Sequence, residues 1–208
     1  MKLIGSALSP YAVRVMLAAR YKGIDLPLEA AGTEHRSLNP IGKVPVLVDG
    51  SLVLPESEII LEYLEDRFPK PTLLPGDATR RANARLLARL LDVYSAPSFG
   101  PFIAQPGDPE AIAAAIARID AALGHIDHFR IDGTHASGDA FSVADCALIP
   151  FFHAFEGLDG PFHLFDLVRQ RPKLEAWWSR ARTSDLGAFA NDVISKAVAE
   201  FFRARSSS

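Results

Sequence analysis

The chain has 208 residues, 49% of them hydrophobic, and a formal net charge of −3, so it can bury a core in one or two domains. The chain lacks the excess of basic residues that would indicate nucleic acid or an anionic membrane as its partner. Its single cysteine excludes an intrachain disulfide and a cysteine-based metal cluster. Because no apolar run reaches the roughly 18 residues of a membrane span and the first residues lack a signal-peptide pattern, we expect a cytoplasmic protein with a small-molecule or protein partner.

The first 76 residues alternate short apolar stretches with helical runs, which predicts a small α/β domain. Strands are expected at residues 2–4, 26–30, 44–48 and 51–54, and helices at 11–22 and 57–67. The pair Asp49-Gly50 favours a two-residue hairpin, so the last two strands should run antiparallel. The proline-rich segment FPKPTLLPGD cannot continue a helix, so it is predicted to be a linker.

Beyond residue 76 the pattern is almost entirely helical. Large aliphatic residues recur at helical spacing from Ile112 to Ile126 and mark one face of a helix. Further helices are expected at residues 80–94, 142–155, 172–183 and 188–205, with breaks at 97–109 and 157–161. The sequence therefore predicts an α/β domain over residues 1–76 and an all-helical domain over residues 77–208.

Two features of the first domain suggest a site for an extended polar ligand. Val44-Pro45 opens an expected strand, where proline is tolerated, and a cis bond there would free the backbone groups of Val44 to pair with a peptide-like ligand. Ser57 is expected to be the N-cap of the following helix. A helix N-terminus with a capping hydroxyl can also bind a carboxylate.

Five stretches of the chain resemble the glutathione transferase superfamily: SPYAVRV, LNPIGKVPVL, PESEIILEYLEDRFP, GDAFSVADCALIPFF and RPKLEAWWSRA. They follow the order of the family over almost the whole chain. The resemblance implies a cytosolic, bacterial-like detoxification enzyme of the serine type. Its thioredoxin-like first domain would bind glutathione, and its helical second domain would supply most of the pocket for an apolar second substrate.

The resemblance also implies which residues bind glutathione. Pro45 would be cis and the backbone of Val44 would pair with the cysteinyl unit. Glu56 and Ser57 would hold the γ-glutamyl end, and Lys43 would reach the glycyl carboxylate. The ligand's chemistry agrees, because it offers an ammonium to Glu56 and carboxylates to Ser57 and Lys43.

Ser9 is the first candidate for the catalytic residue. A thiol with a reference pKa near 8.5 is only about 3% thiolate at pH 7, and both a hydroxyl donor and a helix N-terminus favour the charged form. The SPY stretch resembles the Ser-Pro-Phe entry of serine-type family members. Because serine cannot form a mixed disulfide, we expect conjugation of the thiol to an electrophile. Ser6 and Tyr11 are the second and third candidates.

Several alternatives stay open. The aromatic residues Tyr94, Phe99 and Phe102 could line the pocket for the acceptor substrate, although packing alone would explain them equally well. His125 and His128 lie three residues apart without a completing ligand, so we expect no metal site. The same scaffold also occurs as a glutathione-dependent isomerase, an ether-cleaving lyase or a non-catalytic protein-binding relative.

Opposite charges on two consecutive helices bear on the oligomeric state. The basic stripe is Arg81, Arg85 and Arg89, and the acidic one is Glu58, Glu62, Glu65 and Asp66. The resemblance implies a dimer in which the first domain of one subunit packs on the second domain of the other. We therefore expect a homodimer whose association weakens with salt.

Overall fold

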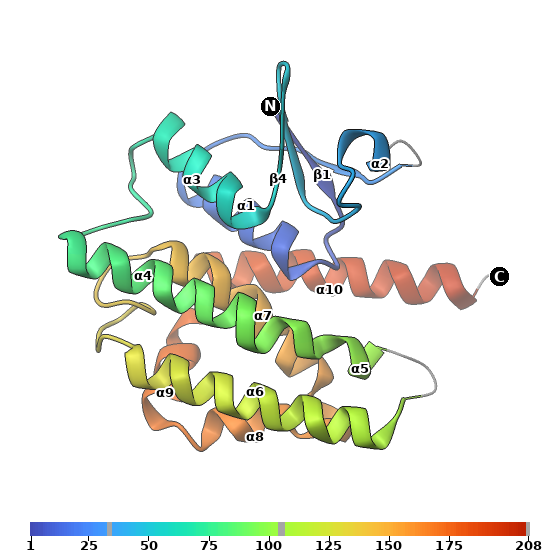
Figure 1. Cartoon of the computed structure of the whole chain (residues 1–208), viewed down its shortest axis with the longest axis vertical. Coiled ribbons are helices and arrows are strands. Elements are labelled where there is room, and N and C mark those ends of the chain that lie inside the picture. The colour runs from blue at the N-terminus through green and yellow to red at the C-terminus, as the bar shows by residue number, and fades with distance from the viewer. Residues whose placement is uncertain (33–34, 104–106, 207–208) are drawn as a thin grey trace. The chain divides into compact units, whose positions relative to one another are not determined.

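The computed structural model describes residues 1–32, 35–103 and 107–206, and it divides into two compact units (Figure 1). Unit 1 comprises Met1–Leu73 and Ser184–Ser208, and unit 2 comprises Leu74–Thr183. Unit 1 contains a four-stranded sheet with helices and unit 2 is helical. This confirms the predicted fold class, a thioredoxin-like α/β domain followed by helices.

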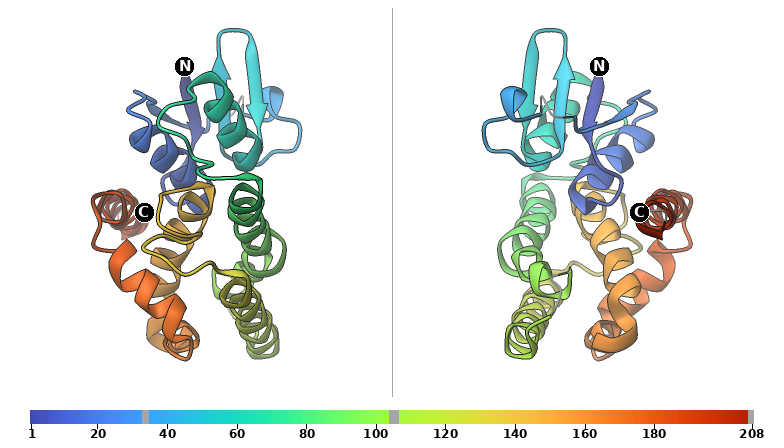
Figure 2. Two further views of the ribbon diagram at one scale, coloured as in Figure 1. Left: turned by 90° about the vertical axis from the view of Figure 1, so that its left-hand side faces the viewer. Right: turned by 90° about the vertical axis from the view of Figure 1, so that its right-hand side faces the viewer.

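The sheet of unit 1 has the strand order β2-β1-β3-β4. Its strands are β1 (Lys2–Gly5), β2 (Leu28–Ala30), β3 (Val46–Asp49) and β4 (Leu52–Pro55). β1 runs parallel to β2 and antiparallel to β3, and β3 and β4 form the predicted antiparallel hairpin, drawn in cyan in Figure 2. Asp49 pairs with Leu52, so the turn residues are Gly50, with φ 59°, and Ser51, one position later than expected.

Three helices of unit 1 pack around this sheet. α1 (Pro10–Tyr21) and α3 (Ser57–Arg67) lie together on one side, and the short α2 (His35–Leu38) lies on the other (Figure 1). The core between sheet and helices consists of fully buried aliphatic side chains, among them Leu3, Val13, Leu17, Leu47, Ile60 and Leu64. The sequence did not indicate α2, because four residues are too few for a helical period.

The C-terminal helix α10 (Asp185–Ser206) packs with unit 1. The guanidinium carbon of Arg20 in α1 lies 4.8 Å from the ring centroid of Phe189, and Ala190 is fully buried. The expected second domain, residues 77–208, therefore differs from compact unit 2 at its C-terminal end. Helical periodicity shows that a helix has an apolar face but not which unit that face contacts.

Unit 2 is built from consecutive helices. α4 (Ala78–Leu90) continues through a π-helical turn (Leu91–Ser95) and a 3₁₀ turn (Ala96–Phe99) into α5 (Gly100–Ile103). The remaining helices are α6 (Pro109–Phe129), α7 (Val143–Phe162), α8 (Leu164–Arg169) and α9 (Pro172–Ala181). Residues 97–103 of the break expected at 97–109 are thus helical turns, and residues 104–106 lie outside the described part of the chain.

The break predicted at residues 157–161 is wrong, because α7 runs through Gly157 and Gly160 to Phe162, and its C-cap residue is His163, whose φ is 51°. The helix buries Phe151, Phe152 and Phe155, and such packing overrides the weak helix propensity of glycine and proline. No helix within the described residues is both long and apolar enough to span a bilayer.

The N-terminus of α7 organises the core of unit 2. Ser142 and Asp145 form a capping box, and the buried Asp145 carboxylate also accepts hydrogen bonds from the Ala136 N–H at 2.8 Å and the Trp177 indole at 3.2 Å. Burial raises the pKa of Asp145, although these hydrogen bonds favour its charged form. The adjacent Cys146 is a buried thiol.

Candidate functional site

Three segments that carry the predicted glutathione residues meet at one edge of the unit 1 sheet. Because β3 is antiparallel to both β1 and β4, the end of β1, the start of β3 and the end of β4 lie at the same edge. Ile4 pairs with Val46, and Val46 pairs with Pro55. The register therefore brings together the N-terminus of α1, the segment before β3 and the N-terminus of α3.

Ser9 is the N-cap residue of α1, and its side chain makes no capping hydrogen bond. Pro10 occupies the first turn, as the sequence predicts. The Ser9 carbonyl accepts the N–H groups of Ala12 and Val13 at 2.9 and 3.0 Å, so the backbone alone closes the first turn. The hydroxyl is thus left available at the positive end of the helix dipole.

The two alternative hydroxyl groups have other surroundings. The Ser6 hydroxyl accepts a hydrogen bond from the Leu8 N–H at 3.2 Å and so stabilises the turn between β1 and α1. The ring of Tyr11 lies over the guanidinium of Arg14, with 5.2 Å between the ring centroid and the guanidinium carbon. These contacts support the predicted ranking of Ser9 before Ser6 and Tyr11 but do not test it.

The segment before β3 has the expected cis bond between Val44 and Pro45. Pro45 is buried close to the end of β1, where a Cβ on Gly5 would lie 3.7 Å from the Cβ of Pro45. Pairing of β3 begins at Val46, and the N–H and C=O of Val44 make no hydrogen bond with any residue that the structure describes. This leaves Val44 with a free backbone edge.

At the N-terminus of α3 the structure corrects one expectation. The N-cap is Glu56, with φ 70° and no side-chain capping bond, and Ser57 is the first helical residue. A non-glycine residue with positive φ is uncommon, and such strained residues concentrate at functional sites. Ser57 therefore lies one position too late to cap the helix, and its hydroxyl accepts a hydrogen bond from a neighbouring arginine.

That arginine, Arg14 in α1, was missed by the sequence reasoning. Its side chain is 1% exposed, and its Nη1 donates to the Oγ of Ser57 at 3.3 Å. It is the one charged residue among the buried apolar residues Val13, Val15 and Leu17. A single arginine inside the apolar run AVRVMLA was the signal that could have found it.

Two charged side chains of the site have no ion-pair partner among the described residues, namely those of Lys43 and Glu56. Both are exposed. Arg36 adds a second cation near this segment, because its Nη1 lies 3.1 Å from the position that a Cβ on Gly42, the residue before Lys43, would take. The site therefore offers an ammonium and a guanidinium before β3 and a carboxylate before α3.

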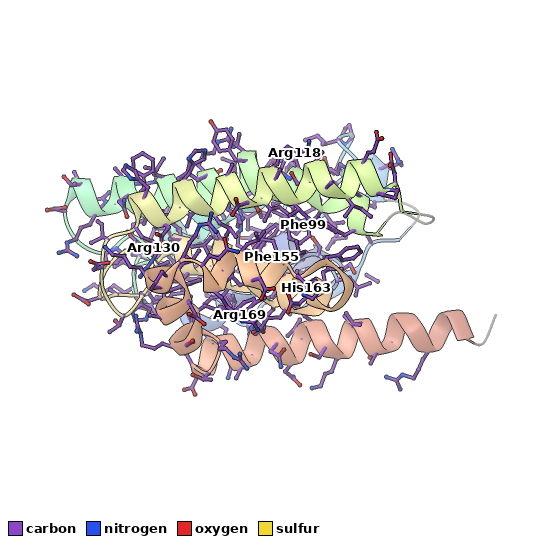
Figure 3. The ribbon with its side chains drawn as sticks, turned by 90° about the horizontal axis from the view of Figure 1, so that it is seen from below. Phe99, Arg118, Arg130, Phe155, His163 and Arg169 are labelled. Carbon is purple, nitrogen blue, oxygen red and sulfur yellow. The ribbon has the colours of Figure 1, made fainter. Side chains whose placement is uncertain are left out.

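In unit 2, the three aromatic residues predicted for the acceptor pocket lie in different environments. Phe102 is buried against Phe162, and Phe99 stacks on Phe155 with ring centroids 5.2 Å apart. Figure 3 labels Phe99 and Phe155, which lie between helices of unit 2. Tyr94 is 53% exposed. Phe99 and Phe102 thus contribute to the packing of unit 2, whatever else they contact.

A separate shallow pocket of about 430 Å³ lies in unit 1 between α1 and α10. It contains none of the predicted site residues; its lining is Met16, Ala19, Arg20, Gly23, Ile24, Asp25, Leu26 and Phe189. Within the described residues no group of three histidine, cysteine, aspartate or glutamate side chains could hold a metal ion. The polar edge of the sheet is therefore the candidate site.

Comparison with known proteins finds similarity over both units. A model of the glutathione S-transferase N-terminal domain matches residues 3–72, and one of the C-terminal domain matches residues 109–178. A maleylacetoacetate isomerase of Pseudomonas aeruginosa is 33% identical over 86% of each chain. Glutathione S-transferase L1 of Arabidopsis thaliana is 30% identical over 81% of this chain and 72% of its own.

A solved structure of a maleyl pyruvate isomerase, described as a bacterial glutathione S-transferase of the zeta class, is 25% identical to this chain. It superposes with a TM-score of 0.78 over 93% of this chain and 98% of its own. The similarity thus extends from the sequence to the backbone.

Proposed function

Because this chain belongs to the glutathione transferase family, we propose that it binds glutathione at the edge of the unit 1 sheet. We further propose that it conjugates the glutathione thiolate to an electrophilic, largely apolar small molecule in the cytoplasm. The observation that carries this proposal is the convergence, at that edge, of a hydroxyl that makes no capping bond with a backbone segment and charges of both signs that have no partner among the described residues.

Each group of the tripeptide has a counterpart in the proposed site. The backbone of Val44 pairs with the cysteinyl unit in the manner of an added strand. Glu56 binds the ammonium of the γ-glutamyl unit, and Ser57 with the free N–H groups of α3 binds its carboxylate. Lys43 binds the glycyl carboxylate, and Arg36 adds positive charge nearby.

In the proposed reaction the thiolate is the nucleophile and Ser9 stabilises it. The hydroxyl donates a hydrogen bond to the sulfur, and the N-terminus of α1 adds its partial positive charge. Both effects favour the thiolate over the thiol and so increase the reactive fraction at neutral pH. The sulfur then bonds to an electrophilic carbon of the second substrate, which either loses an anionic leaving group or, where the attack breaks a C=C bond, takes up a proton at the neighbouring carbon. Tyr94, Phe99 and Phe102 remain the residues proposed to line the pocket for that substrate.

A second candidate function, isomerisation, is favoured by the names of two relatives. The curated relative that is 33% identical is named a maleylacetoacetate isomerase, and the structural relative is a maleyl pyruvate isomerase. Such an activity would use the same site and the same thiolate. The two functions differ in their stoichiometry, because conjugation consumes glutathione whereas isomerisation returns it.

The deciding experiment measures glutathione consumption and products together. The full chain is first tested for glutathione binding by titration calorimetry and then incubated with glutathione and either a generic aromatic electrophile or maleylacetoacetate. Consumption of glutathione with a thioether product by mass spectrometry supports conjugation. Turnover without consumption supports isomerisation, binding without turnover supports a non-catalytic scaffold, and absence of binding contradicts the proposal.

A further inference from the structure

The hydrogen bond between Arg14 and Ser57 connects the two helices whose N-termini form the candidate site. Arg14 lies on α1, the helix that begins after Ser9, and Ser57 opens α3. Both side chains are buried, with 1% of Arg14 and 5% of Ser57 exposed. The contact therefore fixes the hydroxyl of a proposed ligand-binding residue from inside the unit.

The chemistry of the two groups sets the direction of this hydrogen bond. A guanidinium carries only donors, so the Oγ of Ser57 must accept the proton from Nη1 of Arg14 at 3.3 Å. A serine hydroxyl has one proton of its own to donate. Because Oγ accepts the hydrogen bond from Arg14, the hydroxyl proton of Ser57 points away from Arg14 and can be donated to another acceptor.

The position of Ser57 indicates what that acceptor is. Ser57 is the first residue of α3, where the backbone N–H groups have no partner within the helix and attract a negative group. A carboxylate bound there would receive the hydroxyl proton of Ser57 together with these N–H groups.

We propose that Arg14 is a positioning residue that orients the Ser57 hydroxyl to donate to the α-carboxylate of the γ-glutamyl unit of glutathione. This inference rests on the proposed function, because it concerns how the same site recognises one end of the same ligand. The ring of Tyr11 lies over the guanidinium of Arg14 and holds it in place. In this proposal Tyr11 acts through Arg14.

The test compares glutathione with an analogue in which hydrogen replaces the α-carboxylate of the γ-glutamyl unit. Calorimetry gives the dissociation constant of each ligand for the full chain and for Arg14→Met, Ser57→Ala and the double variant. Arg14→Met should weaken glutathione binding by about tenfold or more, the effect of losing one hydrogen bond to a charged group. Binding of the analogue should stay unchanged.

The double variant separates positioning from a general structural role. If Arg14 acts through Ser57, Arg14→Met should add no further loss of glutathione affinity to Ser57→Ala. Arg130→Met is the matched control, because Arg130 is also buried and donates to main-chain carbonyls of unit 2, including that of Lys173 at 2.9 Å. It should lower stability and leave the ratio of the two dissociation constants unchanged.

Arg14→Lys keeps the positive charge and a donor, so it should restore part of the preference for glutathione over the analogue. If Arg14→Met does not fold, the ratio of the two dissociation constants is measured with Arg14→Gln, which removes the charge and shortens the side chain, and a ratio equal to that of the wild type overturns the inference. Equal weakening of both ligands by Arg14→Met, or additive losses in the double variant, also overturns it. A wild-type chain that binds neither ligand overturns the proposed function and this inference with it.

Discussion

Two serines near the start of α1 differ in what their hydroxyl groups do. That of Ser6 accepts a hydrogen bond from Leu8, whereas that of Ser9 makes no capping bond at the N-cap position. A serine at the N-cap that makes no capping hydrogen bond lacks about 1 kcal/mol of the helix stabilisation that such a bond provides. Departures of this kind from the most stable local arrangement are expected at functional sites, and this favours Ser9 as the residue that stabilises the thiolate.

Ser9→Ala should lower turnover and leave glutathione affinity nearly intact, because the proposed binding contacts lie at Lys43, Val44, Glu56 and Ser57. One hydrogen bond to a charged group corresponds to about one to two powers of ten in rate. The pKa of the bound thiol should rise by about one to two units in parallel. Thiolate absorbance against pH, measured with steady-state kinetics, checks both expectations.

Ser6→Ala is the control for that experiment and should leave both the turnover and the pKa of the bound thiol close to those of the wild type. The assignment would have to move to Ser6 if the Ser6 variant lost the thiolate and the Ser9 variant kept it.

Ser9→Cys should convert the site from thiolate stabilisation to thiol exchange. A cysteine at the N-cap of α1 would have a lowered pKa, because the helix dipole favours its thiolate. It should form a mixed disulfide with glutathione and gain reductase-like activity at the expense of conjugation. Intact-protein mass spectrometry after incubation with oxidised glutathione measures the adduct, and an unmodified Ser9→Cys chain would count against a helix-end site at this position.

At the scale of elements, Lys22 joins α1 to the segment that leaves unit 1. Its side chain is completely buried, and its ammonium lies 2.7 Å from Oε2 of Glu65, 2.6 Å from the Phe68 carbonyl and 2.9 Å from the Pro71 carbonyl. Glu65 also accepts hydrogen bonds from the hydroxyl of Thr72 and, at 2.8 Å, from the N–H of Leu73. This network fixes the end of α3 and the proline-rich segment to α1.

The pKa of Glu65 gives this network a pH dependence. Burial alone would raise that pKa, but the hydrogen bonds from Lys22, Thr72 and Leu73 lower it below the ordinary 4.5. Because the folded-state pKa lies below the unfolded one, the stabilisation is complete above about pH 4.5 and is lost as pH falls through the folded pKa. Urea unfolding between pH 7 and pH 3 should show this loss.

Glu65→Gln is the matched control and should flatten that part of the pH dependence, because glutamine does not titrate. Lys22→Met should lower the free energy of unfolding at pH 7 by roughly 3–5 kcal/mol, as expected when one partner of a buried pair is removed. An Lys22→Met chain as stable as the wild type would show that the contact contributes nothing.

For the whole molecule, the structure changes the basis of the dimer prediction. Glu65 does not belong to an outward acidic stripe, since Lys22 holds it. Each unit does expose apolar side chains beside charged ones, with Ile59 on α3 50% exposed and Leu86, Val93 and Tyr94 also exposed along α4 and its π-helical turn. These exposed apolar side chains are candidates for contact with a second copy of the chain.

We propose that the chain forms a homodimer through these faces of α3 and α4. Light scattering at micromolar concentration and low ionic strength should give twice the mass of the chain, and added salt should weaken the association because exposed charges are screened. Ile59→Glu should shift the protein to the monomer without unfolding it. A monomeric mass of the wild type at low ionic strength contradicts the proposal.

The sequence alone predicted the order of the four strands and of the longer helices, and the antiparallel β3–β4 hairpin. These features rest on local patterns, namely hydrophobic period and turn residues, which a single stretch of chain carries. The motifs also indicated the candidate site residues, because family resemblance preserves the residues at a site together with their spacing.

Only the tertiary structure decided which side chains meet across the sheet edge. Arg14 reaches Ser57 over a sequence separation of 43 residues, and α10 packs with unit 1 although its sequence follows unit 2. Helical period identifies a buried face and not its neighbour, so neither contact could be predicted from spacing. The sequence therefore predicted that the Ser57 hydroxyl caps a helix, whereas its hydrogen bond from Arg14 depends on the packing of α1 against α3.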